Sequence, residues 1–121
     1  MKASEQKQSV GSLRISRDVI ATIAGTAARE IEGVYSLAPA PVDLRGMLAK
    51  RHLPRSVGIA LSDDIAVIDL QLILRDGTRI SSISERVQQS VKESVQSMTG
   101  ITVSKVNVTI SGIHFDAPEQ S

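Results

Sequence analysis

The chain has 121 residues, a net charge of +1, no cysteine and two aromatic residues, Tyr35 and Phe115. This composition excludes disulfides, thiol catalysis and thiolate metal sites, and it argues against nucleic acid and glycan partners, which need charge or stacking platforms. The length fits one domain that buries roughly two-thirds of its unfolded surface in a core of Ile, Val, Leu and Ala. The start, MKASEQKQSV, does not resemble a signal peptide, and no stretch approaches the roughly 20 apolar residues of a membrane span, so we expect a cytoplasmic protein.

The first part of the chain predicts a tail, a short strand and a helix. Residues 1–10 are polar and aperiodic, which indicates a disordered N-terminal tail ahead of one domain at 11–115. Gly11–Ile15 predicts a brief strand, placed at a sheet edge. Ser16 then suits an N-cap, and the helix should run to about Glu32. Its apolar residues recur at helical spacing on one face: Val19, Ile20, Ile23, Ala24, Ala27, Ala28 and Ile31.

The segment Tyr35–Arg55 is the least regular, because prolines at 39, 41 and 54 interrupt it. Within it, VDLRGMLAKRHL fits either a solvated loop whose leucines pack onto the domain or a short basic amphipathic helix. In the second interpretation, a basic set would contact anionic lipid or an acidic partner: Arg45, Lys50, Arg51 and Arg55.

Two central strands are predicted, Ser56–Ser62 and Ile65–Leu74, joined by a turn at Asp63-Asp64 into an antiparallel hairpin. The second strand reads IAVIDLQLIL and is the centre of the fold. Because side chains alternate in a strand, its apolar set can be buried while Asp69 and Gln71 stay partly exposed to solvent. That apolar set is Ala66, Ile68, Leu70, Leu72 and Leu74.

A second helix is predicted near Ser82, where Ser82 and Glu85 have capping-box spacing, and it ends at Gly100. Its apolar stripe is Ile83, Val87, Val91, Val95 and Met98. The last strand, Thr102–Ser111, places Val106, Val108 and Ile110 on one side and Lys105, Asn107 and Thr109 on the other.

These elements predict an α+β fold, a single two-layer domain with a four-stranded, mainly antiparallel sheet and two helices on one face. The element order is βαββαβ, followed by a C-terminal tail at 116–121. The order of the strands within the sheet stays open, although a ferredoxin-like arrangement is one solution.

No motif predicts catalysis. His52 and His114 lack partners at metal-ligand spacing, and Asp63 and Asp64 are explained by their turn. No serine lies in a Gly-x-Ser-x-Gly elbow, and the glycines are not spaced for a phosphate loop. We therefore expect no enzyme, no cofactor, no metal and no small-molecule substrate.

Two stretches together resemble a known family. Ile15–Leu37 reads ISRDVIATIAGTAAREIEGVYSL, and Val87–Phe115 reads VQQSVKESVQSMTGITVSKVNVTISGIHF. Both are similar to the alkaline shock proteins, bacterial cell-envelope stress proteins of the Gls type. The resemblance implies a non-enzymatic cytoplasmic scaffold that self-associates and lies near the membrane through a membrane-anchored protein partner. It also implies an alternative, an accessory subunit of a fatty-acid kinase system.

The chain lacks the long acidic and Lys-rich extensions of the stress-induced members, so filament formation and stress induction are left open. A candidate self-association face lies on the solvent-exposed side of the predicted sheet and comprises Arg14, Asp69, Gln71, Lys105 and Asn107. A nucleic-acid-binding module using the basic central loop is the weaker alternative, since the net charge is near zero.

Overall fold

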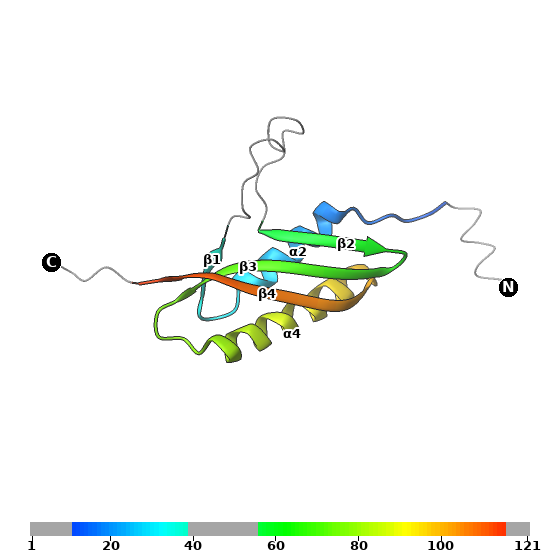
Figure 1. Cartoon of the computed structure of the whole chain (residues 1–121). Helices are drawn as coiled ribbons and strands as arrows, with labels where there is room; N and C mark the ends of the chain where they lie inside the picture. Colours follow the sequence, from blue (N-terminus) through cyan, green and yellow to red (C-terminus); the bar gives the residue numbers. More distant parts are fainter. Residues whose placement is uncertain (1–10, 39–55, 116–121) are drawn as a thin grey trace, which may run out of the picture.

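The computed structural model describes residues 11–38 and 56–115. They form two helices and four strands: α2 (Arg17–Arg29), β1 (Val34–Leu37), β2 (Val57–Ser62), β3 (Ile65–Arg75), α4 (Ile80–Thr99) and β4 (Thr102–His114). Both helices lie against one face of the sheet (Figure 1). The predicted class, a two-layer α+β domain with a mainly antiparallel four-stranded sheet, is confirmed.

β3 is the centre of the sheet and β4 runs parallel to it along its whole length. The other edge of β3 is shared by two antiparallel strands. β2 pairs with its first half, where Val57 meets Leu70, and β1 pairs with its second half, where Leu37 meets Leu72. β1 and β2 therefore lie end to end as one interrupted edge, whereas β4 forms the opposite edge without a break (Figure 1).

Gln71 marks the point where the two halves of the interrupted edge meet. Its N–H donates to the carbonyl of Ser56 at 3.0 Å, and its carbonyl accepts from the N–H of Ala38 at 2.8 Å. The N–H and the carbonyl of Gln71 point to the same side of β3. Ser56, just before β2, therefore accepts from one, and Ala38, just after β1, donates to the other.

The predicted first strand at Gly11–Ile15 is wrong, because residues 11–16 have no regular secondary structure. The fourth strand is β1 instead, and the chain begins with helix then strand where the prediction had strand then helix. The reason is burial. Leu13 is 83% exposed, whereas Val34 is buried against β3.

Gly33 makes this entry into the sheet possible. Its φ of 103° lies in the left-handed region, which glycine adopts without steric cost. The turn brings the Gly33 carbonyl to 2.8 Å from the N–H of Arg75, at the far end of β3. α2 itself ends before this turn, with Glu30 as its C-cap, slightly earlier than the predicted end near Glu32.

The helix starts follow the sequence in one case of two. Ser16 caps α2 as predicted, because its Oγ accepts from the N–H of Val19 at 3.2 Å. The capping box predicted at Ser82 is wrong. α4 begins at Ile80 after Arg79, which makes no side-chain capping bond. The helix ends as expected, with Gly100 at a φ of 76°.

The core lies between the sheet and the two helices. The five apolar β3 side chains predicted to be buried are all at most 1% exposed, and four residues of the α4 stripe are buried with them. Val19 and Met98 are exceptions to the predicted stripes, at 47% and 70% exposed, and both lie near a helix end. Among the described residues no polar or charged side chain is buried, so the core is wholly apolar.

Candidate protein-interaction surface

On the face of the sheet opposite the helices, here called the open face, no helix or strand of residues 11–38 and 56–115 covers the sheet. On this face Asp69 and Gln71 of β3 lie beside Asn107 and Thr109 of β4. Asn107 Nδ2 donates to Asp69 Oδ1 at 2.9 Å, and Ser111 Oγ donates to Gln71 Oε1 at 3.3 Å. The register also sets Lys105 beside Val67. The structure thus brings four of the five predicted self-association residues onto one surface, and their role in binding stays a prediction.

The fifth residue, Arg14, does not join this face. It is exposed and belongs to residues 11–16, which pair with no strand, so its predicted place in the sheet is wrong. The basic set predicted to contact lipid or an acidic partner lies outside the described residues, and its role stays a prediction: Arg45, Lys50, Arg51 and Arg55.

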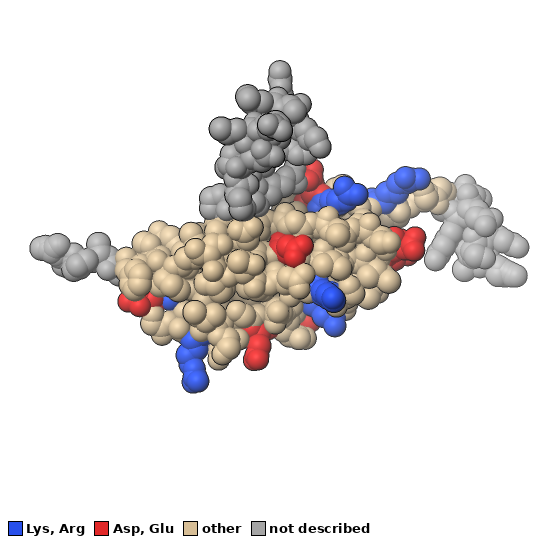
Figure 2. All heavy atoms as spheres, in the orientation of Figure 1, with Lys and Arg blue, Asp and Glu red and all other residues tan. Residues whose placement is uncertain are grey.

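Charge on the open face is scattered. Figure 2 shows acidic and basic side chains interspersed on a mainly uncharged surface. A surface that binds nucleic acid uses several cations in a row, because each contact with the phosphate backbone adds to affinity. The described part of this face shows no such row of cations in this view.

A cluster of planar side chains closes one end of the open face. The rings of Tyr35 and His114 stack at 3.7 Å between centroids with an angle of 8°, and the guanidinium carbon of Arg75 lies 5.3 Å from the Tyr35 centroid. These residues come from β1, β4 and β3, so the stack joins both edges across the central strand. No sequence signal predicted this cluster, because its members are distant in sequence.

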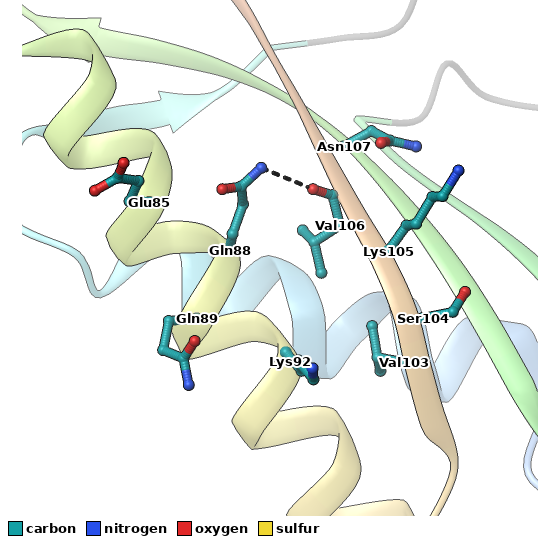
Figure 3. Close-up of a pocket in the computed structure, with 9 residues that line it drawn as sticks. All are labelled: Glu85, Gln88, Gln89, Lys92, Val103, Ser104, Lys105, Val106 and Asn107. Carbon is teal, nitrogen blue, oxygen red and sulfur yellow. Dashed lines mark hydrogen bonds between the residues drawn. The ribbon is translucent and has the colours of Figure 1, made fainter.

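A groove runs along the outer edge of β4. It has a volume of about 410 Å³ and lies between this edge and α4 (Figure 3). Glu85, Gln88, Gln89 and Lys92 line it from the helix, and residues 103–107 line it from the strand. In the sequence Glu85 is noted only for its spacing from Ser82, and the groove itself gives no signal there because it depends on how α4 packs beside β4.

Two glutamines of α4 bond the backbone of this edge. Gln88 Nε2 donates to the carbonyl of Val106 at 3.0 Å, and Gln96 Oε1 accepts from the N–H of Val103 at 2.9 Å. The first part of the β4 edge is therefore satisfied by side chains. Both bonds also show that Val103 and Val106 direct backbone groups away from β3.

Within 11–38 and 56–115, no three His, Asp or Glu side chains gather closely enough to hold a metal ion. Neither described helix has the length and apolar character needed to cross a membrane.

Comparison with known proteins places the chain in a family. It is 28% identical to the uncharacterized protein YqhY of Bacillus subtilis, over 99% of this chain and 90% of that protein. It is 31% identical to the uncharacterized protein YloU of the same species, over 94% and 98%. A solved variant of the MamM CTD has the same fold, with a TM-score of 0.51 at 10% identity over 80% of this chain and 98% of the other.

The family model covers nearly the whole domain. It matches residues 5–115, which include both stretches on which the sequence resemblance rests. The chain therefore belongs to the alkaline shock protein 23 family, whose function is described as cell envelope-related.

Proposed function

We propose that this chain is a non-enzymatic scaffold or adaptor in cell-envelope homeostasis and stress response. It acts in the cytoplasm by associating with copies of itself, and it lies near the membrane because it binds a membrane-anchored protein. Membership of a family with a cell envelope-related function supports the setting of this proposal.

One observation carries the self-association part. β4 is 13 residues long and has no strand on its outer side among the described residues. An exposed strand edge presents backbone donors and acceptors that another chain can pair with. Such an edge, next to an open sheet face, supplies the kind of surface on which protein copies assemble.

The polar residues of the open face support a binding role over a catalytic one. Asn107 is bonded to Asp69, and Ser111 is bonded to Gln71. These pairs hold each other between strands, and in neither is a nucleophile set beside a general base. We expect them to keep the face rigid and correctly spaced for a protein partner.

Self-association is tested by size-exclusion chromatography with light scattering over a hundredfold range of concentration. We expect the mass to rise with concentration. A triple variant with Arg45, Lys50 and Arg51 changed to Glu shows whether the central segment also contributes, because a mass that no longer rises with concentration would place a contact there. A strictly monomeric wild type at every concentration would contradict the self-association part.

The membrane partner is tested by flotation of the purified chain with three kinds of vesicle. These are inverted membrane vesicles from Bacillus subtilis, the same vesicles after protease treatment, and vesicles made from the extracted lipids alone. We expect binding to the untreated membranes only. Equal binding to the lipid vesicles would replace the protein partner by direct lipid contact, and no binding to any would remove the membrane part of the proposal.

A further inference from the structure

We propose that β4 pairs with β4 of a second copy, antiparallel about a two-fold axis at Val108, so that the two sheets become one. This inference rests on the proposed self-association and names the surface that carries it.

The β4 edge presents backbone groups at regular intervals. The carbonyl of Val106 points outward, because Gln88 of α4 reaches it at 3.0 Å from the side opposite β3. Alternate residues of a strand direct their backbone groups to the same side. Val108 and Ile110 therefore also present their N–H and carbonyl groups at the outer edge, beyond the reach of the two α4 glutamines.

The regular part of this edge has clear limits. β4 shifts register against β3 at Ser104 and again at Ser111, where one extra residue is inserted each time. Bulges of this kind bend a strand and interrupt pairing. Between the two bulges, Lys105–Ile110 pairs with β3 without a register shift. This run is long enough to include three residues whose backbone N–H and carbonyl groups point away from β3.

The interior of this run carries no device that keeps edges from pairing, since Lys105 stands at its start and the bulges lie just outside it. Natural edge strands are protected by charges, prolines or short length. Residues 106–110 of the run read VNVTI and contain no charge and no proline. Four of them are β-branched or favour extended structure, so the run is well suited to remain a strand in contact with another.

The run is complementary to itself when two copies pair about Val108. Val106 then faces Ile110 of the second copy, and Val108 faces its own equivalent, all on the helix side of the sheet. These three side chains are half-buried in the single chain, and pairing would remove more of their apolar surface from contact with water. Asn107 faces Thr109 of the second copy on the open side, where both are exposed.

Charges and existing bonds are compatible with this register. Lys105 faces Ser111 of the second copy, so no like charges are opposed directly within the pair. The Val106 carbonyl has two lone pairs and can accept from Ile110 of the second copy while it keeps Gln88. A two-fold arrangement uses the same patch on both copies, as closed dimers do.

The register is tested by charge changes at exposed positions, measured as dimer dissociation constants by sedimentation equilibrium. Thr109→Lys places the new lysine diagonally from Lys105 of the second copy, and the axis repeats this contact. We expect the dissociation constant to rise roughly tenfold or more, because cross-strand like charges oppose pairing. Adding Lys105→Glu should restore the constant to within about threefold of wild type, because opposite charges then lie diagonally across the pair.

Ala60→Lys is the matched control, since Ala60 is exposed on the same face but belongs to β2. It should leave the dissociation constant unchanged, and circular dichroism should show that all variants are folded. Three results would overturn the proposal: wild-type affinity in Thr109→Lys, an equal loss in Ala60→Lys, or no rescue in the double variant. Any of these would leave self-association itself standing, whereas a wild type that stays monomeric would remove both proposals.

Discussion

The two edges of the sheet share one central strand but are built in different ways. β1 and β2 divide one side of β3 between them, and residues 39–55 intervene between them in sequence. β4 pairs with the other side of β3 along its whole length, and two glutamines of α4 form hydrogen bonds with its backbone. The difference teaches that an edge with a break at its middle offers few consecutive backbone groups, while a continuous edge offers a template for pairing.

Removing a side chain that both edges share should have the largest effect. Leu72 is fully buried, and it pairs with Leu37 of β1 and Ile110 of β4. Leu72→Ala should lower the free energy of unfolding by about 3 kcal/mol, because a cavity remains where both sides of the sheet meet. Urea unfolding followed by circular dichroism measures this, and a loss below about 1 kcal/mol would mean that β3 is not the shared centre.

The interrupted edge alone should respond to a change at Gly33. A Cβ at this position would lie 2.7 Å from Ile83 Cδ1 and the φ of 103° is unsuited to other residues. Gly33→Ala should cost about 2 kcal/mol in unfolding free energy, from backbone strain and the contact together. Gly77→Ala is the control, because its φ is 87° with no atom within 4 Å of the added Cβ. An equal loss in both variants would show that the contact with Ile83 contributes nothing.

A smaller effect is expected at the start of α2, the helix that packs on β1 and β2. Ser16→Ala removes the oxygen that accepts from the N–H of Val19 and should cost about 1 kcal/mol in unfolding free energy. Ser12→Ala, in the exposed segment before the helix, should change the stability by much less. Thermal unfolding of the two variants side by side provides the measurement, and equal melting temperatures would rule out the cap.

The smallest effect is expected on the continuous edge. Gln88→Ala removes the exposed bond to the Val106 carbonyl and should lower the unfolding free energy by less than about 1 kcal/mol. Self-association should not weaken, because the same carbonyl stays available to the second copy. A clear loss of self-association in this variant, by light scattering, would indicate that α4 rather than the strand edge carries the contact.

Much of this comparison was accessible from sequence. The alternation in Ile65–Leu74 predicted the buried face of β3 correctly, and the Asp63-Asp64 turn predicted the hairpin with β2, because both signals are local. The start of α2 followed from one capping residue, Ser16.

The parts that failed depend on distant contacts. Val34–Leu37 is only four residues long and shifts register against β3 after Val34, so its strand character comes from pairing with β3 rather than from a clear alternation. The groove between α4 and β4 and the stack of Tyr35 on His114 likewise need the tertiary arrangement. The glutamines at 88 and 96 gave no signal, since their bonds are to backbone atoms of another element.

Cross-linking between two single-cysteine variants tests the central claim most directly, because the chain has no cysteine of its own. Asn107→Cys and Thr109→Cys are mixed under mild oxidation at a concentration where the wild type associates. Directly opposed positions of this type in an antiparallel pair have Cα atoms about 4.5 Å apart, within the range for a disulfide. The proposed register predicts a disulfide-linked dimer on non-reducing gels in the mixture, far in excess of that from either variant alone. Equal yields of linked dimer in the mixture and in the single variants would contradict β4 pairing about Val108. So would the absence of linked dimer in a mixture that is shown to self-associate.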